Sequence, residues 1–598
     1  MKLTALFSLL ALGELCWATS LAGECKCTPT DKCWPSAKTW KSLNKAVSGK
    51  LIRNTPPAIS CYPGPHHNKK ECASVLKQWS NSTFQSLDPI GYIYPTEELC
   101  LPVDLAAGEK PGKCILGQAP VYTINATTSQ DLVAGMKFAQ KHNIRFVVRN
   151  TGHDLIGKSE GYGSLQVWIK YLRDGITIDD KFKPSDQCTK SDWTGAAITI
   201  SGGYVWRDVY NLAFPKNLTV VGGGDPTVGC IGGYIQGGGH SPASRDYGLA
   251  TDQILEAQVL LADGSIVTAS PCQNSDLYFA LRGGGGGTYG IALSMTIKAY
   301  PSKPVVAQAL TVIPLSSDSS ALLNAVTDIH EAYPCINDAG FSGYGTWSIN
   351  GPAAFIGNQS VGYVHAVAAM GISLDEGQKA FEPLLSKLRA VNGTQLFVSV
   401  DWFEFPSYPA YYMAMSGNQL PVGGSTSAMT SRMFDKQSLT GNRTALAEMV
   451  STIAGTPEEM TLMSVVFTGG GAVKNHDPLS GLNPAWREAY MVQVVTRVWA
   501  PGSDAAIIKA VRQDISYKKN WAMRKITPFL GSYMNEADRK DPVWETDFYG
   551  EHFLPLSMVK QKYDPTGFFY CPTCVGSASW YEDLLPGREY GPLCATGL

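Results

Sequence analysis

The stretch 222–241 reads GGGDPTVGCIGGYIQGGGHS and decides the fold. Because glycine carries no side chain, the nine glycines of this stretch let the backbone approach a planar ligand closely. A flexible linker would be polar and rich in glycine and serine, whereas apolar Val228, Ile231 and Ile235 lie between these glycines. The stretch therefore predicts a backbone wall against a planar ligand.

A second motif, VVRNTGHD at 147–154, overlaps the apolar run 144–148, which predicts a buried strand. Upstream, Thr128 and Asp131 have the spacing of a capping box at the start of a helix. Gly152 allows a tight turn whose backbone N–H groups can bind a pyrophosphate. His153 leaves this turn and suits the holding of a cofactor, although a loop histidine by itself is most often a surface or hydrogen-bonded residue.

Further α/β signals follow up to residue 300. Strands are predicted at 254–262 and 265–269 around an Asp-Gly hairpin turn, and a short helix is predicted at 275–282. The run 282–290 holds five consecutive glycines but lacks the strand–GxGxxG–helix context and the later acidic residue of a Rossmann site. An NAD site of that kind is therefore not expected.

The remainder of the chain predicts a second α/β domain without a chemical motif, followed by an aromatic-rich tail. The tail is too short for a core of its own, so we expect it to pack on an earlier domain. Strands are expected at 306–313, 462–467 and 490–499, and amphipathic helices at 319–333 and 375–391. The predicted division is 1–22 (signal peptide), 23–114 (Cys-rich extension), 115–300, 301–520 and 521–598.

The N-terminus is typical of a secretory signal. Lys2 precedes the apolar run 3–15, and the small residues Ala18, Ser20 and Ala22 follow it. The alternative is a buried N-terminal helix. No other stretch is long and apolar enough to span a bilayer, and a net charge of −2 argues against nucleic acid or an anionic membrane as partner. We expect a secreted, extracellular protein that is a monomer and has no membrane segment after signal removal.

The cysteines agree with export. Fifteen are present, and the fourteen that remain once Cys16 leaves with the signal are an even number, which suits disulfides. The seven within 23–114 could instead hold zinc, but an oxidising compartment favours disulfides, so no metal site is expected. Cys571 and Cys574 are interpreted as structural disulfide cysteines rather than a redox pair. N-linked glycans are expected at some of six sequons: Asn81, Asn125, Asn217, Asn358, Asn392 and Asn442.

Two motifs carry a resemblance to a known family: VVRNTGHD, and the glycine stretch in its longer form GGGDPTVGCIGGYIQGGGHSPASRDYGLATDQ. Both resemble the FAD-linked oxidases of the vanillyl-alcohol oxidase (VAO) superfamily. The resemblance is to the berberine-bridge-enzyme-like branch and its secreted fungal members, whose closing segment is similar to YMNEAD and VKQKYDPTGFFYCPTCVGSASW here. It implies an α/β (α+β) fold. It further implies a bipartite, PCMH-type FAD-binding domain with an inserted substrate domain, in which an antiparallel sheet flanked by helices lies over the flavin.

The resemblance also implies roles for individual residues. His153 is expected to bond covalently to the flavin methyl group, and His240 to lie close to the flavin ring. The turn around His153 would hold the pyrophosphate, and the second glycine stretch would run along the cofactor. The further residues expected to bind or enclose FAD are Arg149, Asn150, Thr151, Gly152, Asp154, Ser159, Gly229, Gly232, Gly233, Gly239, Asp252, Ile291 and Asn535.

The number of covalent links is left open by the sequence. Some relatives add a cysteine thioether on the second glycine stretch, but Cys230 lies one residue later than their motif predicts, and Gly229 occupies the matching position. A single link through His153 is favoured. A second link through Cys230 stays an alternative, beside a buried thiol or a disulfide.

The base that removes the substrate proton departs from the family pattern. Relatives often place a tyrosine directly after the asparagine of a Y-x-N motif, and here Glu536 follows Asn535. If the segment is a strand, Tyr533 and Asn535 share one face and Glu536 lies on the other. Glu536 is the first candidate base, with a pKa raised by burial near the flavin, and Tyr533 is the second. The alternative is that Glu536 is a structural salt-bridge partner.

These features predict an oxidase that takes a hydride from an alcohol or amine carbon onto FAD and passes the electrons to O2, giving H2O2. Carbohydrates, aromatic alcohols and secondary metabolites are all compatible substrates. The alternatives are a dehydrogenase with another acceptor, a secreted flavin-containing binding protein without turnover, and a zinc-stapled structural glycoprotein.

Overall fold

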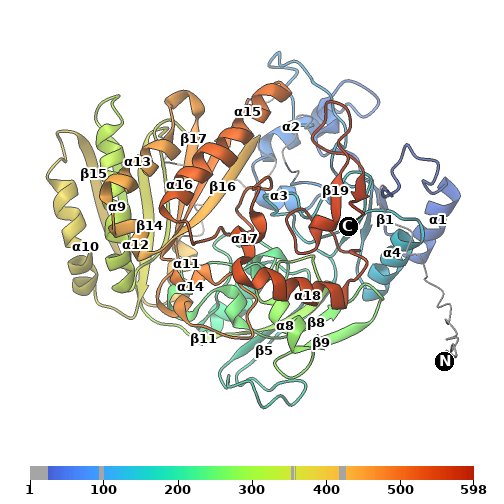
Figure 1. Ribbon diagram of the computed structural model, residues 1–598, viewed down its shortest axis with the longest axis horizontal. Coiled ribbons are helices and arrows are strands. Elements are labelled where there is room, and N and C mark those ends of the chain that lie inside the picture. The colour runs from blue at the N-terminus through green and yellow to red at the C-terminus, as the bar shows by residue number, and fades with distance from the viewer. Residues whose placement is uncertain are drawn as a thin grey trace, which may run out of the picture.

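The computed structural model describes residues 24–92, 94, 100–351, 356, 359–415, 426–500 and 502–597. The predicted signal peptide and the Asn358 sequon lie outside these residues. Among the helices of the described ranges, none is both long and apolar enough to cross a bilayer. Two small sheets and one large sheet, joined by glycine-rich loops, form the framework that positions the site (Figure 1).

The first sheet carries the turn that ends in His153. Its order is β1-β2-β4-β3, with parallel pairing except at β1. The predicted capping box is confirmed, because Thr128 caps α4 and bonds reciprocally with Asp131. The edge strand β1 comes from the Cys-rich extension, so that extension contributes to a regular sheet. The bounds are Leu51–Arg53 (β1), Tyr122–Asn125 (β2), Phe146–Arg149 (β3), Leu165–Trp168 (β4), Ala37–Ala46 (α1) and Ser129–Lys141 (α4).

The second sheet has the antiparallel order β5-β6-β10-β8-β9. The predicted hairpin is confirmed, since β8 pairs with β9 across the Asp263-Gly264 turn. The helix predicted at 275–282 is α8. The bounds are Arg173–Asp179 (β5), Ala197–Gly202 (β6), Ile254–Leu260 (β8), Ile266–Ala269 (β9), Ile291–Lys298 (β10), Trp206–Ala213 (α5), Gly233–Gln236 (α6), Ser244–Tyr247 (α7) and Ser275–Leu281 (α8).

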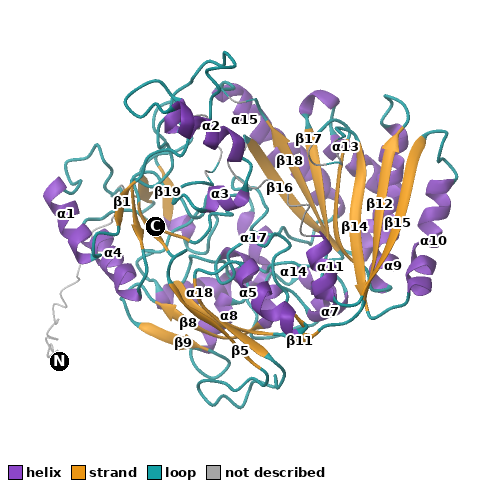
Figure 2. Ribbon diagram, turned by 180° about the vertical axis from the view of Figure 1, so that it is seen from behind, coloured by secondary structure: helices purple, strands orange, loops and turns teal. Residues whose placement is uncertain are grey.

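The large sheet is antiparallel with the order β15-β12-β14-β13-β17-β18-β16. Helices cover one of its faces (Figure 2). The predicted strands and helices of this part are confirmed, but α9 continues past Tyr333 through Pro334 to Asp338. The strand bounds are Val305–Pro314 (β12), Ser342–Ser348 (β13), Gly362–Met370 (β14), Leu396–Phe405 (β15), Ser427–Phe434 (β16), Thr461–Phe467 (β17) and Met491–Val498 (β18).

The helices on that face bury a continuous apolar core. Trp347, Phe381 and Phe467 belong to it, and each is fully buried. The opposite face of the sheet is therefore the one left to meet the glycine loops. The helices of this face are Ser320–Asp338 (α9), Leu374–Arg389 (α10), Lys436–Thr440 (α12), Arg443–Ala454 (α13), Ala505–Asp514 (α15) and Asn520–Ile526 (α16). Two further helices pack elsewhere: Tyr408–Met415 (α11) in the core with α5, and Ala485–Glu488 (α14) beside Tyr533.

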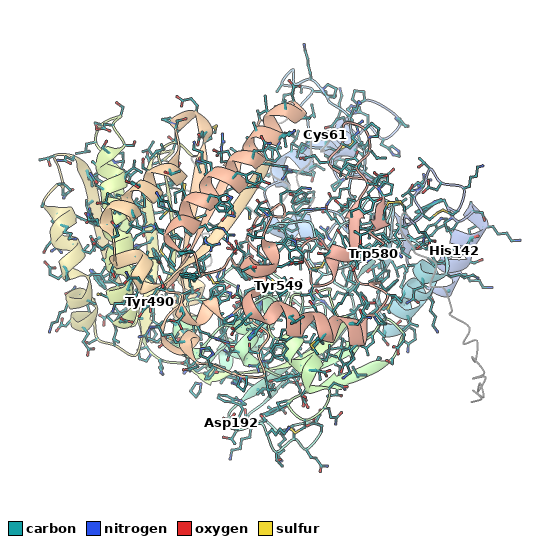
Figure 3. The ribbon with its side chains drawn as sticks, viewed as in Figure 1. Cys61, His142, Asp192, Tyr490, Tyr549 and Trp580 are labelled. Atoms are coloured by element: carbon teal, nitrogen blue, oxygen red, sulfur yellow. A yellow bond between two sulfur atoms is a disulfide. The ribbon has the colours of Figure 1, made fainter. Side chains whose placement is uncertain are left out.

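The C-terminal segment returns to the first sheet. Phe568 stacks on Phe146 of β3 at a ring distance of 5.0 Å, and both belong to the core under that sheet. Figure 3 shows Trp580 on the same side of the view as His142, which follows α4, with Tyr549 nearer the middle of the molecule. The bounds are Trp544–Tyr549 (α17), Phe553–Tyr563 (α18), Trp580–Glu582 (β19) and Leu593–Ala595 (β20).

Six disulfides lie within the described residues. All seven cysteines of the Cys-rich extension are paired, which leaves no thiolates there for zinc, and the Cys571–Cys574 disulfide agrees with the structural interpretation. Cys230 and Cys335 are free, so the even count does not pair completely. The pairs are Cys25–Cys594, Cys27–Cys33, Cys61–Cys72, Cys100–Cys114, Cys188–Cys272 and Cys571–Cys574.

Candidate active site

His153 joins the two glycine motifs. Strand β3 ends at Arg149, and Gly152 at φ +83° turns the chain so that His153 leaves toward the second motif. The imidazole Nε2 lies 2.6 Å from Thr227 Oγ1 and 3.2 Å from Tyr92 Oη. Thr227 donates in turn to Asp225 Oδ1 at 2.7 Å. A hydrogen-bonded chain therefore fixes one ring nitrogen of His153 while no described side chain bonds the other.

The surroundings keep the imidazole neutral. Burial lowers the pKa of His153 to about 4, the negative charge of Asp225 opposes this shift, and the positive charges of Arg149 and Lys170 add to it. A neutral imidazole has a free nitrogen lone pair, which is the form that can attack carbon. This state fits the role predicted for His153.

The turn residues are buried with unsatisfied polar atoms. Arg149 donates to the Tyr92 carbonyl at 3.2 Å and pairs with Glu160 at 3.6 Å, yet its Nε and Nη1 find no hydrogen-bond partner among the described residues. The buried Oδ1 of Asn150 is also unpaired there. Buried polar atoms normally have partners, so Arg149 Nε and Asn150 Oδ1 keep hydrogen-bonding capacity that a polar ligand at the turn could use. Thr151, beside them, is buried too.

The loop after His153 is organised by one carboxylate. Asp154 accepts hydrogen bonds from the backbone N–H of Ser159 at 2.6 Å, from its hydroxyl at 2.9 Å and from the Ile156 N–H at 3.2 Å. The hydrogen bonds between Asp154 and Ser159 therefore fix the conformation of this loop.

The glycine loops leave open backbone beside these groups. A side chain added at Gly232 would meet nothing within 4 Å, and one added at Gly233 would meet only Asn535 at 3.9 Å. The third glycine run approaches so closely that a side chain at Gly286 would lie 3.0 Å from the Gly233 backbone. The loops thus form a backbone wall with unfilled space in front of it. Together with the unpaired polar atoms of the turn, this wall fits a large planar cofactor with an anionic arm such as FAD.

Gly229 and Cys230 point to opposite sides of this wall. A side chain at Gly229 would lie 2.4 Å from Asn150 Nδ2, on the side of the His153 turn. The Cys230 thiol is fully buried in the core of α5 and α8, and burial raises its pKa well above its usual value. The thiol is therefore turned away from the turn and is held protonated.

Glu536 and His240 form a pair at the end of the second glycine stretch. Glu536 Oε1 lies 3.2 Å from His240 Nε2, and His240 Nδ1 lies 3.0 Å from the phenol of Tyr344 in β13. A carboxylate oxygen accepts, so Nε2 is assigned as the donor to Glu536, and Nδ1 is then an acceptor for the Tyr344 hydroxyl, which also lies 3.3 Å from the His240 carbonyl. Tyr344, His240 and Glu536 thus make a chain that crosses from the large sheet to the glycine loops.

Residues 533–536 do not form the strand on which the alternation of faces depended. These residues form a turn closed by the Glu536 N–H bonding to the Tyr533 carbonyl at 2.9 Å. A turn brings the side chains together instead of alternating them. Tyr533 lies edge-on to His240, with ring centroids 5.2 Å apart, and Asn535 donates to Tyr533 Oη and to the Gly233 carbonyl, both at 2.9 Å. Both candidate bases therefore lie at one place.

The two candidate bases differ in their environment. Burial raises the pKa of Tyr533, and the charge of Glu536 raises it further. A phenol in that environment stays protonated at neutral pH. Glu536 keeps a quarter of its side chain exposed, and Oε1 alone is occupied by His240. The geometry favours Glu536 over Tyr533 as the proton acceptor.

Three of the residues predicted to bind or enclose FAD make contacts with other protein groups. Asp252 forms a two-point ion pair with Arg487 at 2.8 and 2.9 Å and accepts from the Leu249 N–H. Ile291 starts β10, pairs with Leu260 and is buried in the core under the first sheet. Gly239, at φ +74°, packs against Ala250. Each of the three thus supports the loops through protein contacts.

Four residues of the site were missed by sequence reasoning. Tyr92 comes from the Cys-rich extension and Tyr344 from the large sheet, and neither lies in a motif. Asp225 and Thr227 lie inside the quoted glycine stretch, where a hydroxyl and a carboxylate two residues apart were a usable signal for a hydrogen-bonded chain.

Comparison with known proteins places the chain in a family. A family model described as FAD binding domain matches residues 120–270, and one described as berberine and berberine like matches 532–576. The FAD-linked oxidoreductase hmp9 of Hypomyces subiculosus is 42% identical over 581 residues, covering 96% of this chain and 91% of that protein. The chain belongs to the VAO-type FAD-linked oxidoreductases. Its predicted membership is confirmed, and it is an FAD-dependent enzyme by that membership.

Other relatives of this VAO-type enzyme agree. The FAD-linked oxidoreductase apf9 of Gibberella fujikuroi is 37% identical over 596 residues, covering 96% of this chain and 97% of that protein. The crystal structure of the VAO-type flavoprotein MtVAO713 from Myceliophthora thermophila C1 superposes with a TM-score of 0.91 at 41% identity, covering 96% of this chain and all of that one. The predicted fold class, an α/β (α+β) PCMH-type flavoprotein with antiparallel sheets, is confirmed.

Proposed function

We propose that the protein is a secreted oxidase that oxidises a carbon bearing a hydroxyl or amine, with O2 as electron acceptor and H2O2 as product. The observation that carries this proposal is the Glu536–His240 pair at the open end of the glycine wall. It combines a proton acceptor with the backbone surface that fits the cofactor. FAD, when bound, accepts the hydride from the substrate carbon and passes the electrons on.

Glu536 takes the substrate proton in this proposal. Its Oε2 has no hydrogen-bond partner among the described residues, whereas Oε1 is held by His240. His240 and Tyr344 orient the carboxylate, and the imidazole can stabilise its charge. Asn535 ties the same turn to Gly233, so that the base is fixed relative to the cofactor wall. Tyr533 stays protonated and shapes the site.

His153 tethers the cofactor as the only covalent link. The tether is supported by the neutral imidazole, by the chain through Thr227 and Asp225, and by the position of the ring between the two glycine motifs. The opposite directions of Gly229 and Cys230 support one link rather than two. Arg149, Asn150, Thr151 and Gly152 would hold the anionic arm of FAD at the turn.

Export is part of the proposal. Six disulfides support an oxidising compartment, and the signal predicted at 1–22 supplies the route. Asn81, Asn217 and Asn442 are exposed and therefore available to N-glycosylation. Mass spectrometry of secreted material should find an N-terminus near residue 23 and glycans at exposed sequons. We also propose a monomer, which light scattering of the same material tests.

Stopped-flow mixing tests the reaction. The flavin is first reduced chemically under argon and then mixed with O2, while flavin absorbance and H2O2 are both recorded. An oxidase reoxidises within seconds and forms one H2O2 per flavin. Slow reoxidation together with fast reduction of an artificial acceptor would indicate the dehydrogenase instead. A flavin that no compound in a broad substrate screen reduces would favour the binding protein without turnover.

A further inference from the structure

The large sheet presents one face to the Glu536–His240 pair, and the strand register identifies the residues on it. Side chains alternate along each strand. Trp347, Val465 and Val495 belong to the core under the helices, so their neighbours in sequence point the other way. Tyr344 is on this second face and bonds to His240. The face therefore borders the site.

Three rows of residues cross five strands on this face, in the order β14, β13, β17, β18, β16. Cross-strand pairing defines them, because each residue is registered opposite the next, except that Leu462 is added to the third row by its alternation with Ser464 along β17. The first row is Ala366, Tyr344, Val466, Val492 and Met433. The second is Val364, Thr346, Ser464, Val494 and Ser431. The third is Gly362, Ser348, Leu462, Thr496 and Met429.

None of these fifteen positions, all within the described residues, holds an acidic, basic or histidine side chain. The same five strands do contain His365, Arg432 and Arg497. All three lie on the helix-covered face: Arg432 is registered opposite Gln493, whose other partner is Val465 of the helix-side core. Within these five strands, charge is thus segregated across the thickness of the sheet. On the same face, the first charged residue is Asp401 of the far edge strand β15, which is registered opposite Ala309.

The hydrogen-bonding capacity of the face is also small. The Ser348 hydroxyl already donates to the Thr461 carbonyl at 2.7 Å, and the Ser431 hydroxyl accepts from the Tyr533 N–H at 3.3 Å. Thr346, Ser464 and Thr496 are the hydroxyls left. Around them Val466, Val492, Val494 and Met433 join Tyr533 and Trp486 in one apolar cluster. The four clustered residues are buried, whereas Val364, Ala366 and Met429 of the same face keep partial exposure. The accessible part of the face thus offers a substrate apolar contact and a few neutral donors.

We infer that the substrate is an uncharged alcohol with a predominantly apolar body, whose hydroxyl meets Glu536 while its body lies on this sheet face. A substrate with a charge on the part that lies on the sheet would lose hydration there without gaining a counter-ion. A carbohydrate would bring a hydroxyl on nearly every carbon to a face that can pair few of them. This inference rests on the proposed function and narrows its substrate class.

Matched compounds test the inference on the flavin-loaded protein. Benzyl alcohol and cyclohexanol are compared with 4-(hydroxymethyl)benzoate, glucose and cellobiose. Binding is read from the perturbation of the visible flavin spectrum, and reaction from its bleaching under argon. The inference predicts that the two apolar alcohols bind at least tenfold more tightly than the carboxylate and the sugars. Tighter binding of either sugar or of the carboxylate would overturn it.

The two proposals fail differently in this experiment. If a sugar bleaches the flavin, the substrate class is wrong and the oxidase stands. If no compound perturbs or bleaches a flavin that chemical reduction and O2 still cycle, the inference is overturned and the cofactor assignment stands. If the chemically reduced flavin does not return with O2, the proposed oxidase is contradicted.

Two serines in one extended row give a matched pair of variants. Ser464 of β17 lies on the face beside the site, and Ser399 of β15 lies on the same face and row at the far edge of the sheet. Ser464→Asp should weaken binding of the apolar alcohol by about tenfold or more, because the added carboxylate is desolvated unpaired. Ser399→Asp should leave it unchanged. Equal effects of the two, or stronger binding in Ser464→Asp, would contradict the inference, and Ser464→Val should retain full binding.

Discussion

The glycine wall and the sheet face border the same site and are built in opposite ways. The wall uses backbone, tight turns and buried charge, with Arg149, Glu160 and Asp225 all within its framework. The sheet face uses neutral side chains in regular register. In the proposed function the difference separates two tasks: the exposed backbone and the cation of Arg149 would hold an anionic, planar cofactor, and the neutral surface would accept the substrate. Substitutions in the glycine wall should therefore affect the cofactor, whereas substitutions on the sheet face should affect substrate binding.

The largest effect is expected where the two sides meet. Glu536→Gln removes the proton acceptor and keeps the shape, so flavin reduction by substrate should slow by about 10²–10⁴-fold. Reoxidation by O2 should stay unchanged, since the carboxylate acts on the substrate. Rapid-mixing kinetics separate the two steps, and Glu551→Gln on the surface is the control. An unchanged reduction rate would exclude Glu536 as the base.

The buried charge of the wall should appear as a pH dependence. Burial raises the pKa of Glu160 to about 7, Arg149 opposes this and Asp154 adds to it. Since the folded state holds the proton more tightly than the unfolded chain, stability falls as pH rises from about 4.5 to about 7, by about 3 kcal/mol for this group. Glu160→Gln should flatten that slope in denaturant titrations between pH 5 and 8. An unaltered slope would show that Glu160 does not contribute a proton-linked change in stability between these pH values and would contradict the raised pKa.

Gly233→Ala asks whether the cofactor lies against the wall. Gly233 is the first residue of helix α6, a conformation that alanine adopts, and a new methyl group meets only Asn535 at 3.9 Å. Folding should be unaffected, while FAD loading should fall about tenfold because the methyl group enters the space assigned to the flavin. Gly112→Ala, which is open and remote from the motifs, is the control. Full loading of the Gly233 variant would move the cofactor elsewhere.

Cys230→Ala should have the smallest effect. The thiol is buried in the core behind the wall, so its loss removes packing worth about 1 kcal/mol and leaves the acid-stable flavin and its visible spectrum unchanged. Absorbance of the denatured protein and thermal melting measure both quantities. A changed spectrum of the attached flavin would reveal a second link and refute the single tether.

Features that depend on neighbouring residues could be predicted from the sequence. Local rules were enough for the capping box at Thr128, the hairpin at Asp263-Gly264 and the long strands of the large sheet, because each depends on neighbouring residues. The glycine motifs predicted the wall for the same reason: glycine at 232 or 286 has a local steric meaning.

Long-range contacts could not be read in this way. Tyr92 reaches His153 across 61 residues and Tyr344 reaches His240 across 104, with no motif to mark either tyrosine. The sequence left open whether 533–536 is a strand or a turn, because the turn that forms there is set by tertiary contacts, with Ser532 bonded to β16 and Asn535 to the glycine wall. Helix α9 runs on past Tyr333, since tertiary packing outweighs the cost of Pro334.

The tether is the claim on which the rest depends, and one measurement addresses it directly. The secreted protein is precipitated with acid, washed, digested with a protease, and its flavin-bearing peptides are sequenced by mass spectrometry. The account predicts that the flavin stays with the protein and that its mass is found on the peptide containing His153 and on no other. Flavin released into the acid supernatant, or attached to a peptide without His153, would contradict it.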